Sequence, residues 1–301
     1  MASAGYANTV GASNLNDISL KRTIQYEKWW DENDGLDADE EGGECRVVNG
    51  LWQVVDILMD GGKTSTLSIA DHIITDCTIQ SVTTVSDDLL EITSSEGQLY
   101  RTHKLVLTVP LSIFKSNAIK FTPPLPPEKV EAFGMMGFDN AVKLIVIFKE
   151  RVWGEDIQNC IASDSLIPEM WFRQCKETGL WVCTCFLTSK MGDDIVKLGL
   201  SKATTACREQ LFEMFAIDSS SSFVTSHLYN WDDIPSIQGG YTHPLPGITE
   251  NNRTTRPRFG EDCWGEYLLC WRGNTYWGMY DCTFGDGIWG EGLWGGARFY
   301  G

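Results

Sequence analysis

The chain has 301 residues, of which 43% are hydrophobic and 22% are charged. These proportions are typical of a folded globular protein, and they exclude a disordered tail, a collagen-like fibre and a coiled coil. The 24 Lys and Arg residues against 41 Asp and Glu residues give a net charge of -17. We expect no nucleic-acid partner, because phosphate binding depends on clustered basic residues. The acidic surface is open to two interpretations, attraction of cationic substrates or simple solubility.

The sequence contains no run of about 20 apolar residues, the length that a membrane-spanning helix needs. Its first residues have neither the basic start nor the apolar run of a secretory signal. We therefore expect an intracellular, cytoplasmic protein that does not enter a membrane. The ten cysteines and four histidines are irregularly spaced and form no metal-binding pattern. They indicate reduced structural thiols, and we predict no metal site.

Residues 22–30 have helical spacing, and they precede an acidic stretch at 31–44 that we interpret as a solvated surface loop. Apolar residues then recur with the spacing i, i+3, i+4 and i+7 at Leu51, Val54, Val55 and Leu58. This spacing predicts an amphipathic helix, which Gly61 and Gly62 end. Three short strands are predicted next, at 79–85, 89–94 and 105–109.

The passage KFTPPLPPEK excludes helix and central strand until Pro127, which is suited to the first position of a helix. Gly137 is predicted to end that helix. The following AVKLIVIF at 141–148 is apolar on both faces and predicts a strand in the middle of a sheet. The remaining predicted elements are a strand at 181–187 and two helices at 193–197 and 203–215, the second capped by Ser201.

Two regions of strands and helices, separated by the proline-rich passage, predict two lobes with a site between them. Lys143 lies in the middle of the 141–148 strand, on the face of Ala141, Ile145 and Ile147 if the strand alternates regularly. A buried ammonium must reach a polar cleft, find a partner or lose its proton. A lysine that extends over a sheet edge into solvent explains the pattern equally well.

Two overlapping segments near the C-terminus, Gly285–Gly290 and Gly290–Gly295, fit the pattern G-x-G-x-x-G. A dinucleotide-binding turn must also follow a strand, open a helix and precede an acidic residue about twenty positions further on. Because the sequence ends at Gly301, we interpret these segments as a Gly- and Trp-rich loop with coincidental spacing.

Three segments together resemble the FAD-dependent amine oxidase family, which includes polyamine oxidases, monoamine oxidases and lysine-specific histone demethylases. They are RVVNGLWQVVDIL at 46–58, the block from Leu105 to Phe148, and WDDIPSIQGGYTHPLPG at 231–247. The resemblance covers roughly residues 40 to 250. It implies a mixed α/β and α+β fold, with part of a Rossmann-like FAD-binding domain and a substrate domain built on a mixed sheet flanked by helices.

The resemblance also implies a division of the chain. We expect a partly flexible N-terminal segment at 1–39 and part of the FAD-binding domain at 40–114. The substrate domain is expected at 115–230. Residues 231–301 are expected to return to the FAD-binding domain with a divergent C-terminus.

The matching positions suggest roles for individual residues. Lys143 takes the place of the family lysine that holds a water against flavin N5, which makes it the expected catalytic residue. Trp231 and Tyr241 match aromatic residues on the substrate side of the flavin, although both also suit a hydrophobic core. The expected contacts to FAD are Ile79, Thr108, Val109 and Pro110, together with Thr283 and Phe284 in a C-terminal motif.

The implied reaction oxidises a polyamine or related small amine by hydride transfer to FAD. The imine product is hydrolysed, and oxygen reoxidises the flavin to give hydrogen peroxide. The sequence departs from the family in that no G-x-G-x-x-G unit precedes residue 40 and Asn274 replaces the Glu of the family's Gly-Glu-x-Thr motif. Gly285 and Asp286 also replace the His-Gly of the family's Thr-Val-His-Gly motif. The alternative is therefore a non-catalytic relative that acts as a binding or interaction module.

Overall fold

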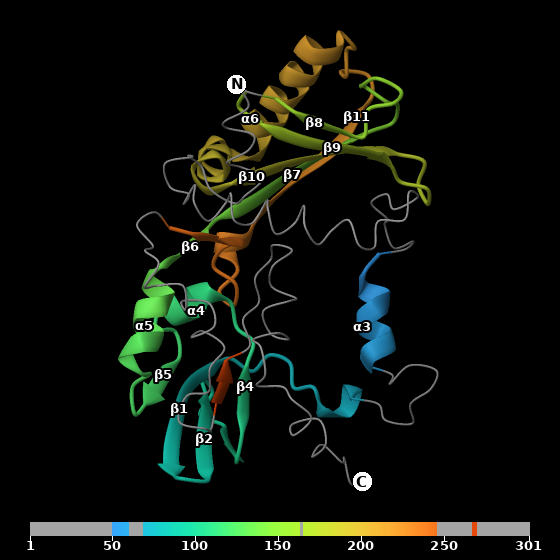
Figure 1. Cartoon of the computed structure of the whole chain (residues 1–301). Coiled ribbons are helices and arrows are strands. Elements are labelled where there is room, and N and C mark those ends of the chain that lie inside the picture. The colour runs from blue at the N-terminus through green and yellow to red at the C-terminus, as the bar shows by residue number, and fades with distance from the viewer. Residues whose placement is uncertain (1–49, 60–68, 163–164, 246–266, 270–301) are drawn as a thin grey trace, which may run out of the picture.

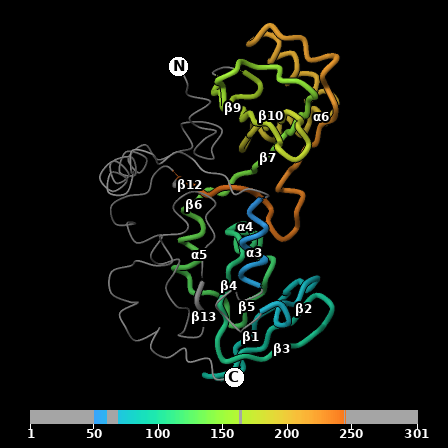
Figure 2. Tube along the Cα trace, turned by 90° about the vertical axis from the view of Figure 1, so that its right-hand side faces the viewer, coloured from blue at the N-terminus to red at the C-terminus, as the bar shows by residue number. Residues whose placement is uncertain are grey.

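The computed structural model describes residues 50–59, 69–162, 165–245 and 267–269. Figure 1 shows two lobes, and Figure 2 shows the same division after a quarter turn. The upper lobe is a sheet covered by the long helix α6 (Ser189–Phe215). The lower lobe contains a second sheet with the short helices α4 (Leu111–Lys115) and α5 (Pro127–Gly134).

The lower lobe is built on a four-stranded sheet in the order β3-β2-β1-β5. β1 and β2 form an antiparallel hairpin, whereas β1 and β5 are parallel. Strands at 79–85 and 89–94 are thus confirmed. The bounds are β1 (Ile79–Ser86), β2 (Leu89–Ser94), β3 (Leu99–Thr102) and β5 (Lys120–Thr122).

A second, parallel pair in the lower lobe joins β4 (Leu105–Leu107) to β13 (Tyr267–Leu269). The strand predicted at 105–109 therefore ends early, because β13 offers only three paired residues and Pro110 already precedes α4 as its N-cap. Buried side chains from both sheets and helices form one core; they include Val82, Leu90, Leu111, Phe114 and Phe133.

The upper lobe is an antiparallel sheet in the order β11-β7-β10-β9-β8. The interior position predicted for the 141–148 strand, β7 (Ala141–Phe148), is confirmed. Its two faces differ, however: the side chains of Val142, Leu144, Val146 and Phe148 are fully buried, whereas Lys143, Ile145 and Ile147 on the opposite face are half-buried. The other strands are β8 (Asn159–Ile161), β9 (Glu169–Gln174), β10 (Trp181–Thr188) and β11 (Phe223–Asn230).

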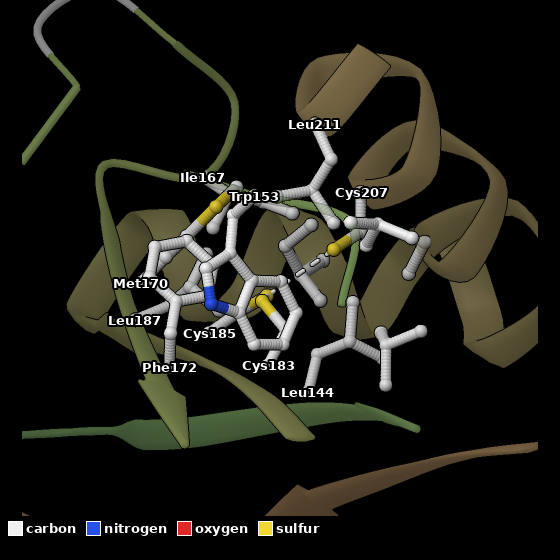
Figure 3. Close-up of a cluster of buried hydrophobic side chains, with 14 of the residues drawn as sticks. Leu144, Trp153, Ile167, Met170, Phe172, Cys183, Cys185, Leu187, Cys207 and Leu211 are labelled. Atoms are coloured by element: carbon white, nitrogen blue, oxygen red, sulfur yellow. Dashed lines mark hydrogen bonds between the residues drawn. The ribbon is translucent and has the colours of Figure 1, made fainter. Parts of the chain in front are cut away.

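The mixed α/β fold expected from the sequence is confirmed, and its parallel pairings lie in the lower lobe. In the upper lobe, α6 packs on the buried face of the sheet, where aromatic, aliphatic and cysteine side chains interdigitate (Figure 3). A break at Gly199, with φ 75° and ψ 160°, divides α6 into two helical segments. Two helices in this region are therefore confirmed, although the first begins at Ser189 rather than at Asp193.

The lobes are connected by a two-stranded pair, β6 (Met136–Asp139) and β12 (Tyr241–Pro244). The helix α5 begins at Pro127 as predicted, but it ends at Gly134, and the prediction that Gly137 ends it is wrong. Gly137 instead lies in β6 opposite His243, where a Cβ atom would overlap the imidazole ring. A glycine is needed there because the ring of His243 on the paired strand leaves no space for a side chain, and not because a helix ends at this position.

The predicted helix at 51–58 is confirmed as α3 (Trp52–Met59), which has no buried residue. A 3-10 turn, η3 (Ala70–His72), precedes β1. No helix of the described ranges is long and apolar enough to cross a membrane. The predicted helix at 22–30, the acidic stretch at 31–44 and the glycine motifs at 285–295 lie outside the described residues.

Candidate functional site

A row of four side-chain positions crosses the upper sheet around Lys143. Tyr229 on β11 pairs with Lys143 on β7, which pairs with Phe186 on β10, which in turn pairs with Glu169 on β9. Residues that pair directly across neighbouring strands point to the same face of a sheet. The row therefore lies on the face opposite α6, on the side of the sheet that faces away from the buried core.

Aromatic rings surround the ammonium group of Lys143. Its Nζ atom lies 5.4 Å from the ring centre of Trp231 and 6.0 Å from that of Phe186. Burial lowers the pKa of Lys143 below its ordinary value. A half-buried lysine on an interior strand does not extend over a sheet edge, so the structure decides between the two interpretations of this residue in favour of a lysine that faces aromatic rings.

Tyr241 completes the aromatic group. Its ring meets that of Phe186 edge-on, with 5.6 Å between ring centres and 88° between planes. Burial raises the pKa of the Tyr241 hydroxyl, and the nearby charge of Glu169 raises it further. Glu169 is itself buried and accepts a hydrogen bond from Trp171 Nε1 at 2.7 Å. The predicted residues Lys143, Trp231 and Tyr241 are thus brought together around Phe186.

Phe186 is the member of this group that the sequence analysis missed. The alternation in β10 places it on the face opposite the buried cysteines, but only the register with β7 places it beside Lys143. That register depends on pairing between strands about 40 residues apart, which a local pattern does not reveal.

The segment from Trp231 to Tyr241 is held by local polar contacts. Trp231 opens the turn η4 (Trp231–Asp233), where Asn230 Oδ1 accepts a hydrogen bond from the backbone N–H of Asp232. Further along, the Ser112 hydroxyl on α4 donates to the carbonyl oxygen of Ile237, which ties this segment to the lower lobe. Gly239 has φ +143°, and a Cβ atom there would overlap the ring of Phe138.

An acidic pocket of about 530 Å³ lies next to this segment. Burial raises the pKa of Asp232, and the neighbouring charges of Asp193, Asp233 and Asp139 raise it further. Among the described residues, no Lys or Arg side chain forms an ion pair with Asp193 or Asp232. The pocket therefore favours a cationic ligand. Its lining residues are Phe138, Asp139, Asn140, Ser189, Asp193, Asp232 and Gln238.

The residues predicted to contact FAD through the lower lobe lie apart from Lys143. Ile79 begins β1, and Thr108, Val109 and Pro110 connect β4 to α4. Ile79 and Val109 are half-buried and pack against the same core, and Thr108 is exposed. Thr283 and Phe284 lie outside the described residues.

Comparison with known proteins identifies the family to which these sites correspond. Residues 29–261 match the family described as flavin containing amine oxidoreductase. The chain belongs to this family. The Arabidopsis thaliana protein named probable polyamine oxidase 4 is 25% identical over 83% of the chain and 46% of its own length. Lysine-specific histone demethylase 1 homolog 2 of the same plant is 27% identical over 55% of the chain and 19% of its own length.

Solved structures show the same fold. Putrescine oxidase bound to putrescine superposes with a TM-score of 0.61 at 14% identity, covering 74% of this chain and 47% of that one. Cyclohexylamine oxidase from Brevibacterium oxydans gives a TM-score of 0.57, also at 14% identity, with 67% and 44% covered. The chain spans less than half the length of each of these proteins and curated relatives.

Membership of a flavin-containing family implies FAD as the cofactor. The hydrogen-bond donors of the Lys143 ammonium group and the rings beside it fit a flavin. Within the described ranges, the Lys143 side chain forms no ion pair and no hydrogen bond, so its Nζ–H groups are available to a water or to an acceptor on a flavin ring. The flanking rings of Trp231 and Tyr241 suit a planar aromatic neighbour.

Proposed function

We propose that the chain forms the amine-binding side of a flavin-dependent amine oxidase, with Lys143 as its catalytic residue. The observation that carries this proposal is the position of Lys143 Nζ, half-buried between the rings of Trp231 and Phe186 with a lowered pKa. When bound, FAD would accept the hydride that leaves the carbon next to the amine nitrogen.

The protein residues would position the amine and manage its protons. Trp231 and Tyr241 would orient the substrate by ring contacts, which attract a cationic nitrogen and pack against its alkyl chain. Lys143 would hold a water beside the reacting carbon, and its lowered pKa makes its proton more readily released than that of an exposed lysine. Ile79, Thr108, Val109 and Pro110, with Thr283 and Phe284, would contact the cofactor.

The acidic pocket supports a polyamine or a related cation as the substrate. Two of its aspartates, Asp193 and Asp232, form no ion pair with a Lys or Arg side chain among the described residues, and Asp232 directly follows Trp231 in the chain. The negative electrostatic potential of these aspartates would concentrate cationic amines close to Lys143. We propose small amines and oxygen as the reactants, and imine hydrolysis and hydrogen peroxide formation as the outcome.

The decisive experiment is flavin reconstitution. The purified chain is mixed with FAD and desalted, and its visible spectrum is recorded before and after anaerobic addition of spermine, spermidine or a monoamine. We expect retained flavin bands that bleach with an active amine, and hydrogen peroxide when air is admitted. A chain that binds amines but retains no flavin would contradict the oxidase and support the alternative, a non-catalytic binding module.

A further inference from the structure

Three thiols from two elements meet in the interior of the upper lobe (Figure 3). Cys183 and Cys185 are two residues apart on β10, so both point to the face that α6 covers, and Cys207 lies on α6. Cys185 Sγ is 3.4 Å from Cys207 Sγ and 3.9 Å from Cys183 Sγ. All three sulfur atoms lie within 4.8 Å of one another, and all three residues are fully buried.

This spacing is that of sulfur atoms sharing one metal ion. A metal–sulfur distance of about 2.3 Å places the sulfurs of a trigonal site about 4.0 Å apart. The two sulfur–sulfur distances of 3.9 and 3.4 Å lie close to and below that value, and all three sulfurs lie within 4.8 Å of one another. A single ion could therefore contact all three sulfurs after side-chain adjustments of less than about 1 Å.

We propose that Cys183, Cys185 and Cys207 form a trigonal thiolate site for a soft metal ion, and that Cu(I) is its preferred occupant. Thiolate ligands select Cu(I) and Zn(II) among the common metals. Zinc sites in proteins are almost always four-coordinate. In the part of the chain that the structure describes, no fourth His, Cys, Asp or Glu ligand atom joins this group.

The side chains around the three sulfur atoms favour a low coordination number for the metal ion. Leu144, Leu187 and Leu211 pack around the sulfurs together with aromatic side chains (Figure 3). Such an apolar shell keeps out water, which would otherwise supply a further ligand.

The binding step needs no oxidant or reductant. Each thiol that becomes a ligand releases one proton, and copper enters and remains as Cu(I). The ion would join β10 to α6 on the face of β10 opposite Phe186, and it would stabilise the upper lobe. Because the three sulfurs are fully buried, the ion must enter during folding or local opening. Copper binding by these three thiols requires neither bound flavin nor the proposed oxidase activity.

The test is refolding of the full chain with Cu(I) alone. The chain is unfolded with a reductant, refolded anaerobically with one equivalent of Cu(I), and desalted against a competing Cu(I) chelator. We expect one retained copper per chain, three sulfur neighbours in X-ray absorption, and a higher melting temperature than in the metal-free protein. The variant Cys207→Val, which keeps an apolar side chain in the core, should bind Cu(I) at least tenfold more weakly.

The matched control is Cys77→Val, because Cys77 is a half-buried thiol in the lower lobe, where it contacts the Tyr100 hydroxyl. This variant should retain copper and show the same rise in melting temperature. Equal copper retention by the Cys207 and Cys77 variants would overturn the proposal. So would a wild-type spectrum with two sulfur neighbours, or a Cys185–Cys207 disulfide found by mass spectrometry in place of bound copper. The spectrum of the wild-type protein tests the site even if Cys207→Val fails to fold.

Discussion

Two opposing effects act on the ammonium group of Lys143. Burial disfavours its charged form and lowers its pKa, whereas the faces of Trp231 and Phe186 attract a cation. Burial is the cause of the downward shift of the pKa. A lysine in this state exchanges protons more readily than one in water, and it does so beside the rings that would hold an amine.

Replacement of this side chain tests its role directly. Lys143→Met keeps most of the side-chain volume and removes the ammonium group, so FAD binding should remain nearly unchanged. Reduction of the flavin by an amine should slow by roughly 10²–10⁴-fold, the usual contribution of a positioned acid or base. Stopped-flow absorbance of the reconstituted protein measures this rate. Lys149→Met, on an exposed lysine just beyond the same strand, is the control, and equal rates in both variants would remove Lys143 from the mechanism.

The lowered pKa of Lys143 also predicts how stability depends on pH. The unfolded chain holds the proton up to the ordinary value near 10.5, whereas the folded chain releases it at lower pH. Between these two pKa values the unfolded state binds more protons, so the free energy of unfolding rises with pH. The free energy of unfolding in urea should rise for wild type relative to Lys143→Met as pH rises toward 10.5. A pH-independent difference would mean that the pKa is not lowered.

Among the elements, the β6–β12 pair is the most sensitive to a small change of volume. Gly137→Ala would place a methyl group into the space of the His243 ring, and we expect a loss of about 1–3 kcal/mol in the free energy of unfolding. Gly134→Ala, three residues earlier at the end of α5, meets no atom within 4 Å and should stabilise by about 0.4–1 kcal/mol. Urea unfolding of both variants measures the contrast. A stabilising Gly137→Ala would contradict the close contact.

Elements with a strong local signal could be predicted from the sequence. β7 has seven apolar residues around Lys143, and α5 begins with a proline suited to that place. β6 and β12 could not be predicted, since each is a strand only because the other lies about 100 residues away. The meeting of Lys143, Trp231 and Tyr241 followed from family resemblance, whereas Phe186 and the three-thiol cluster depend on strand register and on the packing of α6.

At the scale of the whole molecule, the net charge of -17 should favour polycations. We expect the KM for a tetraamine such as spermine to rise with added salt much more than that for a monoamine such as benzylamine. Charges separated by more than about 10 Å are largely screened at 0.1 M salt, and a longer cation has more such interactions to lose. Initial rates of hydrogen peroxide formation at several salt concentrations measure both constants.

The control for this prediction is Asp232→Asn, which removes one charge from the acidic pocket and leaves the rest of the surface unchanged. It should raise the KM for spermine and reduce its salt dependence, with little effect on benzylamine. An equal salt dependence for both amines would mean that the acidic surface serves solubility alone.

The parallel pairing of β4 with β13 has a consequence for how the protein folds during its synthesis. About 160 residues of chain separate Leu107 from Tyr267, and the whole upper lobe lies between them. At about 5–20 residues per second, a ribosome needs roughly 8–30 seconds to add this length. The upper lobe, which is continuous in the chain, can fold in that time, whereas β4 must wait for β13, the strand with which it pairs. The lower lobe is thus begun first and completed last.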